Sequence, residues 1–422
     1  MKGTFRFIGN FVFIVTLFGI LFSYAMFQGG FVSWFLFFGF LPIFLYHIGL
    51  LFYPVKNWKV SRKLTKHVVR AGDTVSVKII IERKIPFPLY YCICEEFISQ
   101  TLNRVDSRQE KYRYLEQPNK LFNNRKIKKM IFPWFKRRIE LSYRLEQVPR
   151  GEHAIHAVRI RTGDVFGMIK KQHVFPVTSE IIAYPNERNI HLSEKITSFE
   201  QGSVTAQTFN LKNTNVATGI REYMPGDRFS WIDWKQTAKK NDVMTKEFEQ
   251  EKSTDTLIVL DGCFHDGLNP LAFEATVEVS LSLMETIRKQ ASQVGFLSIG
   301  ETNTFFPVQH DPTKHEGIRK HLTSVEPART NSFAKKLKEE MLKITNSFYV
   351  IIVTSHMDDA LKDTVQKIKY RKKRASVVYA QSKNAISESE HKILRQLRNE
   401  GIGVTILTED ELVTNPIEVK TL

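Results

Sequence analysis

Residues 261–266 carry the side chains of this chain that are best suited to chemistry, in the order Asp-Gly-Cys-Phe-His-Asp. They follow Thr256–Leu260, a continuous apolar run typical of a buried parallel strand. Asp261 stands at the carboxyl end of this run, where open α/β sheets bind ligands. Cys263 and His265 pair a thiol with an imidazole, the combination that drives acyl transfer and transglutamination. No third group that would orient the pair is identifiable, so we do not expect it to be catalytic.

A second candidate site is the stretch 219–235, which reads GIREYMPGDRFSWIDWK. Its Pro225-Gly226 pair predicts a turn, because proline presets φ at the first central position and glycine accepts a positive φ at the second. Ser230 is well placed to cap a short helix that carries Trp231 and Trp234 on one face. A salt-bridged surface turn is the simpler interpretation, but the pattern is long for one. The surrounding charged residues have both signs: Arg221, Glu222, Asp227, Arg228, Asp233 and Lys235.

This stretch resembles the signature of the bacterial domain of unknown function 58 family. In that family a G-x-R-E-Y-x-P-G-D segment and an I-D-W-K segment precede a von Willebrand factor A-like domain. Two predicted turns, Pro149–Gly151 and Gly163–Gly167, are similar to the family's RG and DPFGL landmarks. Val165 replaces the usual proline of the second landmark, and Met168 replaces the leucine.

Members of that family are often encoded with MoxR-type AAA+ ATPases and transglutaminase-like membrane proteins. The resemblance therefore implies a non-enzymatic adaptor or scaffold that acts with such an ATPase in the assembly or maturation of protein complexes. The sequence contains no H-E-x-x-H, G-x-x-x-x-G-K-[ST] or G-x-S-x-G motif, which agrees with a role outside catalysis. The residues expected to dock the partner are Gly219, Arg221, Glu222, Tyr223, Pro225, Gly226, Asp227, Asp233, Trp234 and Lys235.

The resemblance also raises the question of a metal. Von Willebrand A domains often hold Mg²⁺ or Mn²⁺ through a D-x-S-x-S motif and a further Thr and Asp on other loops. Here Cys263 and His265 replace both serines, and Mg²⁺ prefers oxygen ligands. We therefore predict a degenerate loop without a cofactor, and a metal-dependent ligand-binding module is the alternative. The carboxylates that remain for such a site are Asp261, Asp266 and Asp358.

Phe7–Val55 contains no Asp, Glu, Lys or Arg over 49 residues, which predicts a membrane anchor. A helical span needs about 20 apolar residues, so the segment accommodates two spans. We place them at Phe7–Phe27 and Phe31–Tyr53, with Gln28–Gly30 as the turn. A cleaved signal peptide is the alternative, but this apolar region is too long for one. Lys and Arg flank the pair on both sides and predict that both termini are cytoplasmic.

The net charge of +17 also raises the possibility of nucleic-acid binding. Residues 55–139 hold 21 Lys and Arg against 7 Asp and Glu, a net of +14, so most of the excess lies beside the membrane segment. Residues 117–139 have eight basic residues and no acid, and Phe132, Trp134 and Phe135 are interleaved with them. Contact with an anionic leaflet explains this pattern better than contact with nucleic acid, which we do not expect as a partner.

The order of predicted elements gives the fold. Short strands at Thr74–Glu82, Leu89–Phe97, Arg138–Leu145, His153–Ile160 and Val174–Ala183 predict a small β-sandwich. From residue 255 strands alternate with helices, which predicts a doubly wound α/β domain. Three cysteines without zinc or disulfide spacing suit a reducing cytosol. The predicted parts are two transmembrane helices (1–55), a β-rich domain (56–190), a linker with the signature (191–254) and a von Willebrand A-like α/β domain (255–422).

Overall fold

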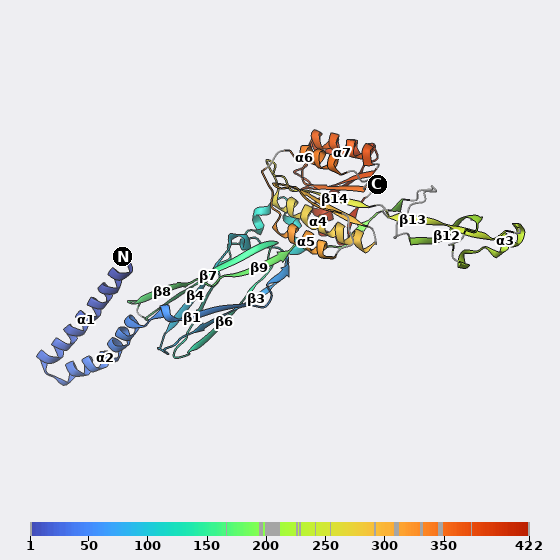
Figure 1. The fold of residues 1–422 in the computed structure, drawn as a ribbon. Coiled ribbons are helices and arrows are strands. Elements are labelled where there is room, and N and C mark those ends of the chain that lie inside the picture. The colour runs from blue at the N-terminus through green and yellow to red at the C-terminus, as the bar shows by residue number, and fades with distance from the viewer. Residues whose placement is uncertain are drawn as a thin grey trace. The chain divides into compact units, whose positions relative to one another are not determined.

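The computed structural model describes most of the chain as two compact units, whose elements Figure 1 shows in order. The first unit is Met1–Arg108 with Asn119–Asn186, and the second is Gln109–Pro118 with Glu187–Leu422. The described residues are 2–165, 167–193, 197–198, 212–224, 227, 229–240, 242–253, 255–290, 293–307, 312–329, 332–344, 349–372 and 374–420.

The first unit begins with two apolar helices, α1 (Lys2–Gln28) and α2 (Phe31–Phe52). Gly29 has φ of +65° in the connecting turn, a conformation that glycine adopts readily. The helices pack through aromatic rings, with the Phe18 ring 5.4 Å from Phe37 and 5.3 Å from Phe44 between centroids. Each helix contains a window long and apolar enough to cross a bilayer, which confirms the two predicted apolar helices.

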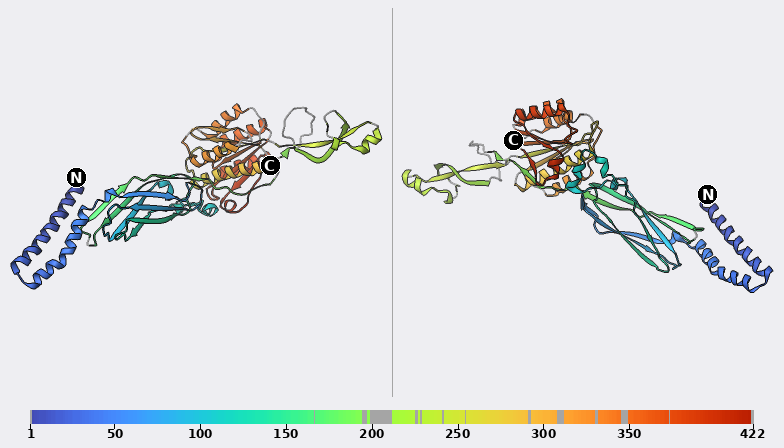
Figure 2. Two further views of the ribbon diagram at one scale, coloured as in Figure 1. Left: turned by 60° about the horizontal axis from the view of Figure 1, so that its bottom comes forward. Right: turned by 180° about the vertical axis from the view of Figure 1, so that it is seen from behind.

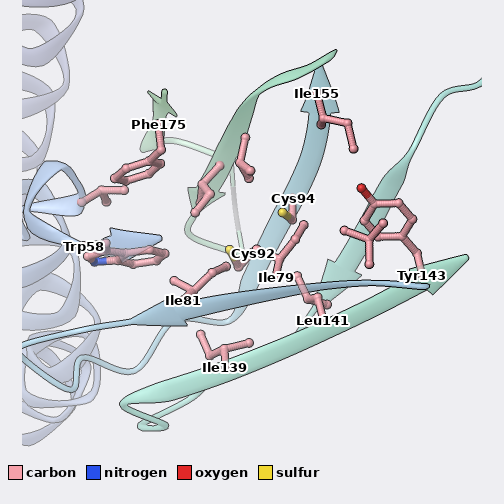
Figure 3. Close-up of a cluster of buried hydrophobic side chains, with 14 of the residues drawn as sticks. Trp58, Ile79, Ile81, Cys92, Cys94, Ile139, Leu141, Tyr143, Ile155 and Phe175 are labelled. Atoms are coloured by element: carbon pink, nitrogen blue, oxygen red, sulfur yellow. The ribbon is translucent and has the colours of Figure 1, made fainter. Parts of the chain in front are cut away.

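The rest of the first unit is a pair of sheets around a common core, as the sequence predicts. One sheet has the order β1-β3-β6 and the other β2-β9-β7-β4-β5, with β8 also paired to β7. Side chains alternate between buried and exposed along β6, so one face of each strand enters the core. Figure 3 shows core residues from both sheets, including the free cysteines Cys92 and Cys94. The bounds are β1 Lys59–Leu64, β2 Val68–Arg70, β3 Val75–Glu82, β4 Tyr91–Ile98, β5 Lys128–Ile131, β6 Arg138–Leu145, β7 Gly151–Gly163, β8 Lys170–Phe175 and β9 Ser179–Tyr184.

The prediction of one strand over Val174–Ala183 is wrong. β8 ends at Phe175 and β9 begins at Ser179, and Pro176 lies between them. Proline has no N–H to give to a ladder, so the pairing is interrupted there. β8 and β9 lie one after the other on the same edge of β7, opposite β4, with β8 beside Val158–Gly163 and β9 beside Gly151–Ile155. The strands β1, β2 and β5 were not predicted.

The second unit contains a six-stranded sheet of the order β16-β15-β14-β17-β18-β19. Neighbours in this sheet are parallel, except that the edge strand β16 runs antiparallel to β15. The predicted alternation of strands and helices is thus confirmed. The bounds are β14 Thr256–Asp261, β15 Val294–Ile299, β16 Thr304–Phe306, β17 Tyr349–Thr354, β18 Arg374–Ala380 and β19 Gly403–Leu407.

Helices cover both faces of this sheet, as Figure 2 shows. Leu257 and Val259 of β14 join one core cluster with residues of α6, α7 and α8, whereas α4 packs against β14 outside that cluster. Because both faces are covered, β14, β15 and β17 are buried at every position. The bounds are α4 Pro270–Lys289, α5 Pro312–Ser324, α6 Phe333–Lys343, α7 Asp359–Lys372, α8 Glu388–Asn399 and α9 Glu409–Val413.

The segment Gln109–Pro118 belongs to the second unit although it lies inside the range predicted for the β-rich domain. Lys111 and the hydroxyl of Tyr112 both bind the carboxylate of Glu278 in α4, the hydroxyl at 2.7 Å. All three side chains are buried. The pairing offsets the cost of desolvating a carboxylate on α4.

Candidate functional site

The signature stretch lies on a β-hairpin of the second unit. β12 (Lys212–Glu222) pairs antiparallel with β13 (Met244–Ser253), and Glu222 faces Met244 where the connection begins. A register shift between Ala217 and Gly219 marks a bulge at the start of the signature. The connection contains the turn η5 (Phe229–Trp231) and the helix α3 (Trp234–Lys240). Pro225, Gly226 and Arg228 lie outside the described residues.

Arg221 and Asp227 hold this connection together. Nη1 of Arg221 donates to Oδ2 of Asp227 at 2.9 Å, and Nη2 donates to Oδ1 at 2.7 Å. Oδ2 of Asp227 also accepts from the backbone N–H of Met224 at 3.0 Å. These bonds hold the pKa of Asp227 below its ordinary value, first through Arg221 and then through Met224. The guanidinium–carboxylate fork therefore braces the signature turn from within.

The helix in the signature starts later than predicted. Oδ1 of Asp233 accepts from the backbone N–H of Lys235 at 3.1 Å and of Gln236 at 3.2 Å, so Asp233 caps α3. The prediction that Ser230 caps a helix with Trp231 and Trp234 on one face is wrong. Trp231 ends η5, and Trp234 is the first residue of α3. The local reason is that Asp233 donates its N–H to Met244 of β13, which fixes the helix start at the strand.

The signature exposes apolar side chains as well as charges. Trp234 is 69% exposed, Phe229 77% and Met224 62%. The rings of Phe229 and Tyr223 stack with their centroids 6.2 Å apart. Large exposed apolar groups in a short segment are typical of interaction sites. Among the residues predicted to dock a partner, Glu222, Trp234 and Lys235 are exposed, whereas Asp233 is used as a helix cap.

The second candidate site lies at the carboxyl ends of β14 and β17. Oδ2 of Asp261 accepts from the hydroxyl of Thr354 at 2.7 Å, and its Oδ1 accepts from the backbone N–H of Cys263 at 3.0 Å. The prediction that Asp261 stands at the carboxyl end of a buried parallel strand is confirmed, and Thr354 ends the neighbouring strand β17. Burial raises the pKa of Asp261 to about 6, although these two hydrogen bonds work against the shift.

Two histidines and a glutamate extend this site. The rings of His265 and His356 stack with centroids 4.5 Å apart, and Nδ1 of His356 lies 3.5 Å from Oε1 of Glu390. The hydrogen bond to Glu390 raises the pKa of His356, whereas burial and the neighbouring His356 lower the pKa of His265. Burial opposes ionisation of Glu390, but hydrogen bonds from His356, Ser387 and Tyr379 lower its pKa to about 2. His356 and Glu390 were missed in the sequence, although the Ser387-x-x-Glu390 capping box was readable there.

A cavity of about 160 Å³ is lined by two of the three predicted metal ligands. Asp261 and Asp358 line it together with Cys263, His265 and His356. Asp266 is exposed and does not line it. One carboxylate oxygen of Asp358 is already used to cap α7, since its Oδ1 accepts from the backbone N–H of Leu361 at 2.7 Å.

The donor set of this cavity does not fit Mg²⁺ or Mn²⁺. Both oxygens of Asp261 already accept hydrogen bonds, and the neighbouring groups are a thiol and two imidazoles. Within the part of the chain that the structure describes, no group of three or more His, Cys, Asp or Glu side chains is placed to hold a metal ion. The thiol of Cys263 points to the carbonyl of Ile299 at 3.8 Å rather than to His265.

Comparison with known proteins places the chain in a family. Residues 219–386 match the family described as Protein of unknown function DUF58. The chain is 32% identical to the Uncharacterized protein YeaD of Bacillus subtilis (strain 168) over 398 residues, which cover 94% of each chain.

Solved structures are only distantly similar. A CARDB domain from Pyrococcus furiosus, solved in complex with di-metal ions, has a TM-score of 0.19 and 8% identity to this chain. The match covers 30% of this chain and 87% of that domain's chain. Proximal thread matrix protein 1 from the mussel byssus has a TM-score of 0.25 and 15% identity to this chain. The match covers 37% of this chain and 42% of the mussel protein's chain. The signature match and the near full-length relative decide the assignment: the chain belongs to the DUF58 family of proteins of unknown function.

Proposed function

We propose that this protein is a membrane-anchored cytosolic adaptor that acts with a MoxR-type AAA+ ATPase in the assembly or maturation of protein complexes. In this proposal α1 and α2 cross the bilayer with both termini in the cytoplasm. The α/β domain is of the von Willebrand A type, a proposal supported by its strand order and by its antiparallel edge strand β16. The protein has no enzymatic activity of its own.

The observation that supports the docking role is that charged side chains of the signature are used within the hairpin, whereas large apolar ones are exposed. Arg221 and Asp227 use their charges on each other, and Asp233 caps a helix. The most exposed apolar side chains of the signature are Met224, Phe229 and Trp234. Aromatic residues dominate the binding energy of protein interfaces when a partner desolvates them. We therefore expect Phe229 and Trp234 to contact the ATPase directly, and the charged brace to present them.

The test is capture of the co-expressed ATPase by the full chain in detergent. Phe229→Ser and Trp234→Ser should abolish capture, since loss of a hot spot costs about 2 kcal/mol or more, roughly a 30-fold weaker Kd. Their melting temperatures should stay near that of the wild type, because exposed substitutions usually change stability by about 0.5 kcal/mol or less. Tyr370→Ser, at a position 86% exposed in α7, is the matched control.

Equal capture by all three variants would overturn the docking assignment. Membrane orientation is tested separately, with reporter fusions at Met1 and Leu422. Both reporters should be cytoplasmic, and an external C-terminus would contradict an encounter with a cytosolic ATPase.

A further inference from the structure

The end of the β-rich domain next to α2 carries an exposed surface with an unusual composition. It consists of residues 83–90, which connect β3 to β4, and residues 130–137, which include the end of β5 and lead into β6. We call these two segments the loop pair. They are physically joined, because Leu89 and Trp134 exchange backbone hydrogen bonds at 3.1 and 3.4 Å. The loop pair is therefore one surface although its segments lie about 40 residues apart in sequence.

The buried guanidinium of Arg83 stiffens this surface. Its side chain donates to the carbonyls of Phe87 at 3.0 Å, Trp134 at 2.9 Å and Lys136 at 2.8 Å. Arg83 is only 3% exposed, and these carbonyls hydrogen-bond the buried cation. One side chain thus ties both segments of the loop pair together.

The loop pair lies against the last two turns of α2. Phe87 stacks on Tyr46 at 5.6 Å and on Tyr53 at 5.1 Å, and the hydroxyl of Tyr53 donates to the carbonyl of Ile85 at 2.8 Å. The approach needs Gly49, because a Cβ there would lie 2.8 Å from the Phe87 ring. The 22 residues of α2 have a length of about 33 Å, close to the roughly 30 Å of a bilayer core. The C-terminal end of α2 therefore lies at the boundary between the hydrocarbon core and the lipid headgroups, and the loop pair lies beside that end.

The side chains on this surface suit that depth. Six large apolar groups are between 42% and 61% exposed: Ile85, Tyr90, Met130, Phe132, Trp134 and Phe135. The rings of Tyr90 and Phe132 contact each other edge to face at 5.8 Å across the two segments. Trp and Tyr are enriched at membrane interfaces, where the ring is apolar and its polar edge stays wet.

The charges point to an anionic leaflet. Lys84, Lys136 and Arg137 of the loop pair are exposed, and Lys129 extends the set along β5. Neither residues 83–90 nor residues 126–138 contain an acidic side chain. Lys and Arg beside a membrane span are attracted to anionic headgroups. Exposed aromatics combined with unbalanced positive charge match a lipid surface in a way that neither feature does alone.

We propose that the loop pair inserts its aromatic side chains into the headgroup region of an anionic bilayer and so holds the β-rich domain against the membrane. This rests on the membrane anchor in the proposed function, but not on the ATPase. The contact adds a second point of attachment to the membrane beside α2 and so fixes the orientation of the domain at the bilayer.

The experiment uses the full chain in liposomes of phosphatidylglycerol and phosphatidylethanolamine. A nitrobenzoxadiazole label is placed at Trp134→Cys, and the native cysteines remain since all three are buried. Lipids with a doxyl group near the headgroup should quench most of this label and shift its emission to the blue. Thr74→Cys is the control, because it is exposed and lies at the other end of β3, about 26 Å away along eight strand residues. Its label should remain unquenched.

Charge is tested on the same label. Lys136→Gln combined with Arg137→Gln, or replacement of phosphatidylglycerol by phosphatidylcholine, should reduce quenching at position 134 and leave the anchor in place. Equal quenching at positions 74 and 134 while the protein floats with the liposomes would overturn the surface contact and leave the anchor standing. Protection from an aqueous quencher without quenching by lipid would show that a second protein covers the surface, which also overturns the proposal. Extraction of the protein from the liposomes by alkaline carbonate would show that α1 and α2 do not span the bilayer. That result would overturn both the membrane anchor and this proposal.

Discussion

Arg221 and Asp227 form a two-pronged ion pair across the signature turn, with both guanidinium Nη atoms within 2.9 Å of the carboxylate oxygens. Two of the charges that identify the family in the sequence are therefore paired with each other within the hairpin itself. A role in bracing the turn and a role in docking a partner predict different results for variants at these positions.

Arg221→Ala and Asp227→Ala should each loosen the turn, because each removes the two hydrogen bonds between these side chains. Asp227→Ala also removes the carboxylate that accepts from the backbone N–H of Met224, and Arg221→Ala leaves that carboxylate without the guanidinium that positions it. Amide hydrogen exchange of residues 222–224 should become faster, without a change in the sheet of the α/β domain. Arg221→Lys should restore only part of the protection, since an ammonium cannot bridge both oxygens in one plane. Glu222→Ala is the control at an exposed neighbour. Unchanged exchange in the two alanine variants would contradict the bracing role.

Lys171 connects the β-rich domain to the end of α2. Its Nζ donates to the carbonyls of Leu51 at 2.7 Å and Tyr53 at 2.6 Å, and burial lowers its pKa. Lys171→Met should remove both hydrogen bonds, after which the carbonyl of Tyr53 keeps only the N–H of Val55, and should destabilise the first unit by about 1–3 kcal/mol. Thermal unfolding of the full chain in detergent measures this loss. Lys170→Met, at an exposed neighbour, should have no comparable effect.

Lys111→Met tests the attachment of segment 109–118 to α4. The substitution leaves the Glu278 carboxylate buried without its cation, and breaking a buried pair in this way costs about 3–5 kcal/mol. We expect a clear drop in the melting temperature of the second unit. Arg113→Met removes only the exposed pair with Glu110 and serves as the control. Equal melting temperatures for the two variants would show that the buried pair does not matter to stability.

Asp261 makes stability depend on pH. Its folded pKa of about 6 lies above its ordinary value of 3.8, so the folded state holds the proton more tightly than the unfolded state. This stabilisation is complete below about pH 4 and is lost as pH rises through 6, for a total of about 3 kcal/mol. Asp261→Asn should remove that part of the pH dependence between pH 4.5 and 7.5, as measured by thermal unfolding. An identical pH profile in the variant would refute the raised pKa.

Metal addition tests the degenerate site. Mg²⁺ or Mn²⁺ at millimolar concentration should leave the melting temperature of the full chain unchanged, because the donor set suits neither ion. A bound ligand at a hundredfold excess over its Kd would stabilise the native state by about 2.7 kcal/mol. A clear rise would mean that Asp261 and Asp358 bind the ion after all, and Asp358→Asn should then abolish it.

The sequence by itself determined the elements whose pattern is local. The absence of charge over Phe7–Val55 marked both apolar helices, and the strand Arg138–Leu145 has its predicted bounds. The family followed from the signature, because turn residues and charges at fixed spacing are readable without coordinates. These features depend on neighbours within a few residues, where periodicity and composition are decisive.

Only the tertiary structure decided which residues meet. Asp233 rather than Ser230 caps α3, because β13 fixes where the helix starts. The stacked rings of His265 and His356 are 91 positions apart in the sequence. The ion pair of Lys111 and Glu278 joins residues 167 positions apart. Such contacts depend on strand order and on the packing of whole elements, and no short window of sequence contains both partners.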